Sequence, residues 1–188
     1  MLCSKSSLGS APAGIVAIVL SLLLLGGCEH AKPVIFVEPQ AAAKAYPLLV
    51  VADVKADPGV KIPADLLKHT KDRLITKFRE AGFTVAEEKP TDPKQDFLLL
   101  DPKIHRYEAG SVLGRWLIGF GQGAAVCALE VEITDGQSGA KAGDAAITET
   151  EQGGGLLSIG AEEYVVDRSV DNIAKGISEK LSKPKAGG

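Results

Sequence analysis

The sequence contains little cysteine, little net charge and few aromatic residues. Its 188 residues include three cysteines, and 21 lysines and arginines nearly balance 24 aspartates and glutamates, for a formal charge of −3. Because basic residues are not in excess, the electrostatic signature of a nucleic-acid-binding protein is missing. The hydrophobic share of 45% and the charged share of 24% are those of a globular domain, which excludes a disordered chain and a polytopic membrane protein. The length suits one domain.

Long apolar runs are also scarce, and the clearest one lies near the N-terminus. Ile15–Leu25 holds eleven uncharged residues, too few at about 1.5 Å each to cross a hydrocarbon core of roughly 30 Å. The run has the length of the apolar core of a secretory signal. It ends in Leu25-Gly26-Gly27-Cys28, which resembles the bacterial lipobox. We therefore expect residues 1–27 to be a lipoprotein signal peptide and Cys28 to carry the lipid. An ordinary secretory signal beside a coincidental cysteine is the alternative.

The remaining cysteines agree with this interpretation. Cys3 would leave with the signal and Cys28 would be acylated, so Cys127 would have no partner for an intramolecular disulfide. Glu29, rather than an aspartate, follows the expected lipid site. By resemblance to enterobacterial sorting rules, this favours the outer membrane over retention in the inner membrane. The expected location is the periplasmic face of the outer membrane, with the inner membrane and the cell surface as less favoured alternatives.

The rest of the chain predicts a tether, one domain and a short tail. Residues 28–46 are expected to form the lipidated tether, in which Val34–Val37 is either an edge strand or a docking peptide. Residues 47–183 are expected to form a periplasmic domain, and residues 184–188 a disordered tail. Between Lys103 and Lys183 the sequence has no proline, as suits central strands and a long helix.

Apolar periodicity predicts two helices. The first begins at Pro63 and ends at Gly82. Its apolar stripe is expected to comprise Leu67, Leu74, Ile75 and Phe78. The second helix is expected from about Ala161 to Leu181.

Strands are predicted by short apolar runs and by alternation. They are expected at Leu48–Ala52, Phe83–Ala86, Phe97–Leu100, Ile104–Tyr107, Cys127–Thr134 and Ala142–Glu151, with an interruption at Asp101-Pro102. This order favours an α+β fold: a single mixed or antiparallel sheet with two helices packed on one face.

A glycine-rich stretch at residues 110–125 invites a nucleotide-binding interpretation. Gly119–Ala124 matches the letters of a dinucleotide fingerprint, but an alternating strand follows instead of a helix. We therefore expect no nucleotide site. The stretch is instead expected to be a packing or interaction segment, and the choice between core packing and an interface stays open. The candidate interaction or packing residues of this segment are Arg115, Trp116, Gly119, Phe120, Gly121 and Gly123.

Residues that often carry catalysis are scattered. His30, His69 and His105 have no partner at metal-ligand spacing, and paired glutamates at 130 and 132 are typical of a solvated strand face. Cys127 shares its face with aliphatic residues, as a small core residue would. We therefore expect no catalytic residue, no metal and no cofactor. An envelope enzyme or a small-ligand carrier with an unrecognised site is the alternative.

The glycine-rich segment and the hairpin after it resemble an uncharacterised family of bacterial lipoproteins that is known as a domain of unknown function. The family pattern G-S-x-x-x-R-x-x-x-G-F-G-x-G-x-A, followed by D-x-x-[ST]-G, is present here as Gly110, Ser111, Arg115, Gly119, Phe120, Gly121, Gly123, Ala125, Asp135, Ser138 and Gly139. The match covers roughly Asp96–Glu151. The wider architecture looks like the small domain at the N-terminus of TolB and in curli-secretion-type lipoproteins.

This resemblance implies a role in envelope assembly or scaffolding rather than a reaction. The expected partners are the membrane, through lipid on Cys28, and another envelope protein or a second copy of the chain. Nucleic acid and nucleotides are not expected partners. A less favoured alternative is a subunit of a membrane-associated oligomeric assembly, with Val112–Ala125 lying on or in the bilayer.

Overall fold

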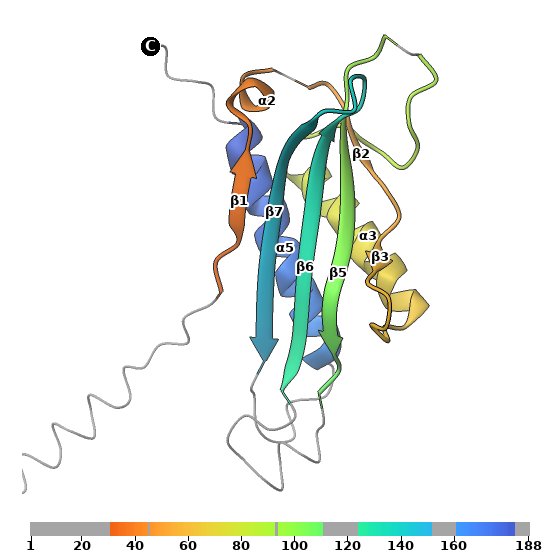
Figure 1. Ribbon diagram of the computed structural model, residues 1–188, viewed down its shortest axis with the longest axis vertical. Coiled ribbons are helices and arrows are strands. Elements are labelled where there is room, and N and C mark those ends of the chain that lie inside the picture. The colour runs from red at the N-terminus through yellow and green to blue at the C-terminus, as the bar shows by residue number, and fades with distance from the viewer. Residues whose placement is uncertain (1–30, 45, 93, 111–123, 152–160, 183–188) are drawn as a thin grey trace, which may run out of the picture. The chain divides into compact units, whose positions relative to one another are not determined.

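A mixed sheet with helices on one face organises the part of the chain that the computed structural model describes, namely residues 31–44, 46–92, 94–110, 124–151 and 161–182 (Figure 1). The elements in chain order are β1 (Val34–Val37), α2 (Pro39–Ala43), β2 (Leu49–Val51), β3 (Lys55–Ala56), α3 (Ala64–Glu80), β4 (Val85–Ala86), β5 (Leu98–Glu108), β6 (Ala125–Asp135), β7 (Lys141–Glu151) and α5 (Ala161–Ser182). Among these residues, no helix is both long and apolar enough to cross a bilayer.

The seven strands are arranged in the order β1-β7-β6-β5-β2-β4, and β3 pairs with β5 beyond the end of β2. Three pairs are antiparallel, namely β1 with β7, β7 with β6, and β6 with β5. Strand β2 pairs in parallel with β4 and with β5, and β3 pairs in parallel with β5. Figure 1 shows the long helices α3 and α5 behind the sheet. The expected α+β fold with a single mixed sheet and two helices on one face is therefore confirmed.

The helix-facing side of the sheet forms the core. Along β6, every second side chain is buried against the helices, because successive side chains point to opposite faces of a strand. The buried β6 residues on this side are Cys127, Leu129, Val131 and Ile133, and α5 adds Val166, Val170, Ile173 and Ile177. The period-two pattern in the sequence thus identified both the strand and its buried side.

Helix α3 lies where the sequence places it, but its buried stripe gains Leu66 and Thr70 and lacks Leu67. Pro63 occupies the N-cap, and Gly82 follows the helix with a φ of +91° that favours glycine. The buried side chains are Leu66, Thr70, Leu74, Ile75 and Phe78. Leu67, expected in the stripe, is half-buried at its border. Leu66 is the core residue because it lies four positions before Thr70 and eight before Leu74 on one helix face.

Strand β5 continues through the expected interruption at Asp101-Pro102. The carbonyl oxygens of Leu100 and Ile104 accept hydrogen bonds from the backbone N–H groups of Ala52 and Asp57, which follow β2 and β3. Pro102 lies two residues from each, so its backbone faces the same neighbours. Its missing N–H lies at the gap between the end of β2 and the start of β3. A proline at this position therefore removes no ladder hydrogen bond, and the strand remains continuous.

The segment expected to be a tether contributes a strand and a short helix. Val34–Val37 forms β1 and pairs with β7, from Val34 opposite Ala146 to Val37 opposite Gly143. This confirms the edge-strand interpretation of Val34–Val37 over the docking peptide. The folded part of the chain thus begins well before residue 47, where the sequence analysis placed the domain boundary. A short apolar run between prolines did not reveal this, because four residues carry too little periodicity.

Two glycines make room for β1. A β-carbon on Gly143 would overlap with the carbonyl oxygen of Phe36, and one on Gly176 in α5 would overlap with the side chain of Ile35. The obstacle at Gly143 is backbone and cannot rotate away. The close approach of β1 to β7 therefore depends on glycine at position 143, whereas the Ile35 side chain opposite Gly176 could adopt another rotamer.

We expect Gly143→Ala to displace β1 while the rest of the sheet persists. The added methyl group meets the β1 backbone, so the amides of residues 34–37 should lose protection in hydrogen exchange. Thr150→Ala, on an exposed site of the same strand, is the control and should leave β1 protected. Unchanged protection of β1 in Gly143→Ala would show that β1 pairs with β7 even when residue 143 carries a side chain.

Val131→Asp should destabilise the fold by several kcal/mol, because it places an unpaired carboxylate at a fully buried position. Glu132→Ala, the next residue on the exposed face, should be nearly neutral. Thermal melting of both variants by circular dichroism tests this pair. A small effect of Val131→Asp would contradict the assignment of the core side.

Candidate functional site

The residues predicted to carry function from sequence lie outside the described residues. Cys28 precedes them, and Arg115, Trp116, Gly119, Phe120, Gly121 and Gly123 all fall within residues 111–123. The flanks of that segment are described. It follows Gly110, whose φ is +75°, and leads into β6 at the fully buried Ala125. A strand therefore follows the glycines, as the argument against nucleotide binding required.

The sheet face away from the helices gathers most of the described polar groups of the strands. Figure 1 shows β5, β6 and β7 lying in front of α3 and α5, so this face is not covered by either helix. It carries Asp101, Lys103, Glu130, Glu132, Asp144, Ala146, Thr148 and Thr150. Opposite charges pair here: the Lys55 Nζ on β3 lies 2.9 Å from an Asp101 carboxylate oxygen on β5, and within β7 the Lys141 Nζ lies 2.7 Å from an Asp144 carboxylate oxygen.

A β-bulge places His105 on this face. In the ladder between β5 and β6, Ile104 pairs with Leu129 and Arg106 with Ala128, so His105 is the extra residue. A bulge changes the direction of the bulged residue's side chain. The imidazole consequently lies between two carboxylates, with Nδ1 2.7 Å from Asp57 and Nε2 2.6 Å from Glu130.

The geometry around His105 requires the charged imidazolium. Ionised carboxylates only accept hydrogen bonds, and a neutral imidazole has one donor nitrogen, so two short contacts need protons on both nitrogens. The hydrogen bond to Asp57, helped by that to Glu130, raises the pKa of His105 above its ordinary value, against the opposing effect of burial. Lys103, 2.6 Å from Asp57, completes the cluster. Through Asp57, His105 and Glu130, this cluster connects the end of β3 to β5 and β6.

A shallow hollow of about 310 Å³ lies beside this cluster. The small side chains of Ala128 and Ala146 leave space on the sheet, and Val34 of β1 and Lys32 stand next to it. His105, Glu130 and Thr148 also line it. The hollow therefore combines apolar surface with a cation and an ionised pair at its border, which suits contact with a partner that is itself partly apolar.

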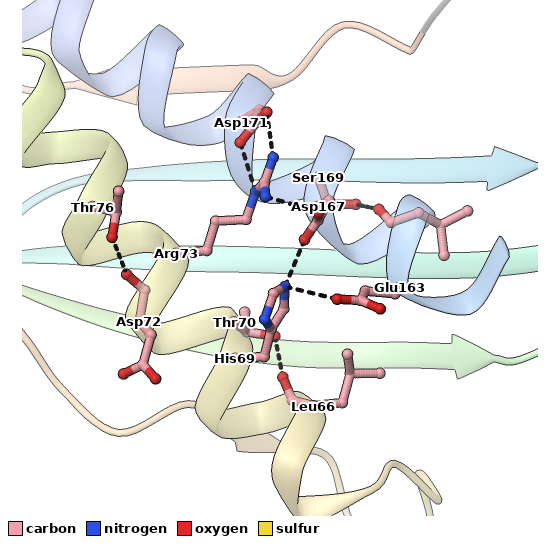
Figure 2. A network of polar contacts seen from close by, with 11 residues as sticks. Leu66, His69, Thr70, Asp72, Arg73, Thr76, Glu163, Asp167, Ser169 and Asp171 are labelled. Atoms are coloured by element: carbon pink, nitrogen blue, oxygen red, sulfur yellow. Dashed lines mark hydrogen bonds and ion pairs between the residues drawn. The ribbon is translucent and has the colours of Figure 1, made fainter. Parts of the chain in front are cut away.

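A second polar network holds the two long helices together (Figure 2). The Arg73 guanidinium on α3 makes two hydrogen bonds of 2.9 Å to Asp171 on α5, and its Nη1 lies 2.8 Å from Asp167. His69, one turn earlier, contacts Asp167 through Nε2 at 2.7 Å. Each acid is thus matched to a base on the facing helix, an arrangement that fixes the helix pair. The sequence could not show this, because the partners lie 98 residues apart.

A buried carboxylate was missed by the sequence analysis. Glu149 on β7 is 2% exposed, accepts a hydrogen bond of 2.7 Å from Asn172 and lies 3.2 Å from Arg168. Its parity was an available signal, since it shares the helix-facing side of β7 with Ala145 and Ile147. The pairing with Arg168 and Asn172 explains how an acid is tolerated in the core.

Cys127 lies opposite Glu149 in the sheet and is fully buried. Burial raises the pKa of this thiol to about 11, so at neutral pH it is protonated and unreactive. This agrees with the expected role of a small core residue. Among the described residues, no group of three or more histidine, cysteine, aspartate or glutamate side chains is placed to hold a metal ion.

The D-x-x-[ST]-G part of the family pattern builds the turn between β6 and β7. One carboxylate oxygen of Asp135 accepts hydrogen bonds from the backbone N–H groups of Gln137 and Ser138 and from the Ser138 hydroxyl, while Gly139 adopts a φ of +71°. The Tyr46 hydroxyl donates to the other oxygen at 2.7 Å. These donors, with the Ser138 N–H foremost, hold the pKa of Asp135 well below its usual range. The pattern here has a structural role.

We expect the His105 cluster to make stability pH-dependent. The pKa of His105 is raised above the unfolded value of 6.5. The cluster therefore stabilises the fold fully below pH 6.5, and this stabilisation is lost as the pH rises through the folded pKa. The stability difference between wild type and His105→Gln should accordingly shrink with rising pH in denaturant melts.

Glu132→Gln, on the same face of β6, is the matched control and should retain the wild-type pH profile. Parallel profiles for wild type and His105→Gln would contradict the charged state inferred from the two short contacts.

Several solved structures are similar to this chain. A Xanthomonas campestris protein of the DUF330 family is 15% identical and has a TM-score of 0.51, with 80% of this chain and 94% of that chain covered. PelC from Paraburkholderia phytofirmans, solved as a dodecamer, is 16% identical, with a TM-score of 0.47 and coverage of 77% and 97%. A DUF4136 protein from Bacteroides thetaiotaomicron is 12% identical, with a TM-score of 0.46 and coverage of 80% and 97%. The first of these likenesses shows the fold alone.

A search of curated proteins finds no match to this sequence. A family model described as a domain of unknown function, DUF4410, matches residues 50–155. The matched range runs from β2 through β7, including the bulge at His105 and the turn at Asp135. Since it covers more than half of the sequence, the chain belongs to the DUF4410 family.

Proposed function

We propose that this chain is a lipid-anchored protein of the bacterial envelope, attached through Cys28 to the periplasmic face of the outer membrane. Its domain would act there as a non-enzymatic interaction or scaffolding module. The observation that carries the proposal is the sequence Leu25-Gly26-Gly27-Cys28, placed after an uncharged apolar run and six residues before the first strand of a folded domain. Glu29 favours the outer membrane.

The chemistry of the described residues supports binding rather than catalysis. His105 uses both ring nitrogens in contacts with Asp57 and Glu130, and the Cys127 thiol is buried and protonated. A general base needs a free lone pair and a nucleophile needs access to substrate. His105 is instead held between two carboxylates, and Cys127 is packed in the hydrophobic core.

The open face of the sheet is the surface that we assign to the partner. It offers alternating charges around His105 and Glu130, on strands β5 and β6 that β7 separates from the edge strand β1. A partner there would be another envelope protein or a second copy of this chain, and copurification after crosslinking in cells distinguishes the two by mass.

Cys28→Ser should abolish anchoring. Without the thiol no diacylglyceryl group can be attached, so intact-mass spectrometry should show loss of the acyl mass and an unprocessed precursor that retains residues 1–27. Cys127→Ser, which changes the buried cysteine, is the control and should be processed and acylated normally. If Cys28→Ser still fractionates with membranes as a mature, acylated species, the proposed anchor is wrong.

A further inference from the structure

The start of β1 brings the domain unusually close to the proposed anchor. Five residues, 29–33, lie between Cys28 and Val34, and the six fully extended steps from one to the other span about 20 Å. If the tether reached to residue 46 instead, the domain could move about three times as far from the lipid. Since β1 is part of the sheet, whichever surface surrounds Val34 must lie near the bilayer.

That surface carries the most exposed apolar side chains of the described residues. Val34 is 73% exposed and Phe36 is 50% exposed, whereas Ile35 and Val37 pack against the core. Because residues two apart in a strand share a face, Val34 and Phe36 form one patch on the edge strand. We call these two side chains the β1 patch. Lys32 is exposed just before it, next to the hollow.

We propose that the β1 patch inserts into the interfacial region of the membrane that holds Cys28, so that the domain docks edge-on against the lipid surface. The inference rests on the proposed function, because it requires the anchor at Cys28. Aromatic and aliphatic side chains bury in the boundary between headgroups and acyl chains, and a lysine beside them meets the lipid phosphates.

The surrounding charges restrict this contact to the edge of the sheet. Asp144 lies opposite Phe36 and is held by Lys141 at 2.7 Å, and Glu38 is exposed directly after β1. Carboxylates at these places disfavour burial of the whole open face in lipid. The edge strand therefore touches the membrane while the His105 cluster stays in water.

A second copy of the chain fits the patch less well. Stable protein interfaces bury about 800 Å² on each partner, and two side chains supply a small part of that area. The same two side chains suffice for lipid, because the acyl chains already provide the affinity and the patch only sets orientation.

The test uses the full, acylated protein in vesicles of phosphatidylethanolamine and phosphatidylglycerol that contain a spin-labelled quencher lipid. Phe36→Cys carries an environment-sensitive fluorophore, and Val34→Cys repeats the measurement at the neighbouring site. Cys127 is fully buried and does not compete for the label. Circular dichroism checks that each labelled variant is folded.

Lys175→Cys is the matched control. Lys175 is exposed on α5 next to Gly176, which approaches Pro33 and Ile35, so it lies near the same N-terminal segment but on the helix side. We expect lipid quenching to be several-fold stronger at Phe36 and Val34 than at Lys175. Equal quenching at all sites, in protein that floats with the vesicles, overturns the docked orientation and leaves the anchor intact.

Two further outcomes are distinguishable. A label at Phe36 that is shielded from aqueous iodide but not quenched by lipid would show that protein covers the patch, which overturns the inference. Failure of the wild-type protein to float with the vesicles would refute the anchor at Cys28, and with it both proposals.

Discussion

The structure depends on covering one face of a single sheet. Because side chains alternate along a strand, placing α3 and α5 on one face sends every second residue of β5, β6 and β7 into the core and its neighbours into water. On β6, for example, Val131 is buried and the next residue, Glu132, is exposed. The open face then collects acids and bases on adjacent strands, where cross-strand pairing satisfies them. Glu149 departs from this rule, and its cost is offset by two polar partners from α5.

How much could be predicted from the sequence depended on the distance over which each signal acts. The alternation in β6 and the apolar periodicity of α3 and α5 are local, and they predicted the sheet, its buried side and both long helices. Phe36 and Gly143, by contrast, meet only after the chain has folded. The four residues of β1 have no periodicity of their own, so the strand was left as one of two alternatives and the tether was drawn too long.

The polar clusters were invisible for the same reason. His105 looked isolated because Asp57 is 48 residues away and Glu130 is 25 residues away. Even with those partners known, the bulge that turns the imidazole towards both carboxylates has no local sequence signal, since neither glycine nor proline marks it. Glu149 is different. Its position two and four residues after Ile147 and Ala145 places it on the buried side of β7, and a buried acid there implies a base on the facing helix.

The N-terminal segment is held by more than its four ladder pairs. Ile35 and Val37 pack against the core, Ala41 of α2 is buried in it, and Gly176 is the position on α5 that admits Ile35. Releasing β1 would expose these apolar groups together and leave an unpaired edge on β7. The segment therefore belongs to the domain, so only residues 29–33 lie between Cys28 and the sheet. With the anchor proposed at Cys28, a connection of about 20 Å at most would limit the orientation of the domain as well as its location, because the Val34 end of β1 would have to stay within that distance of the surface.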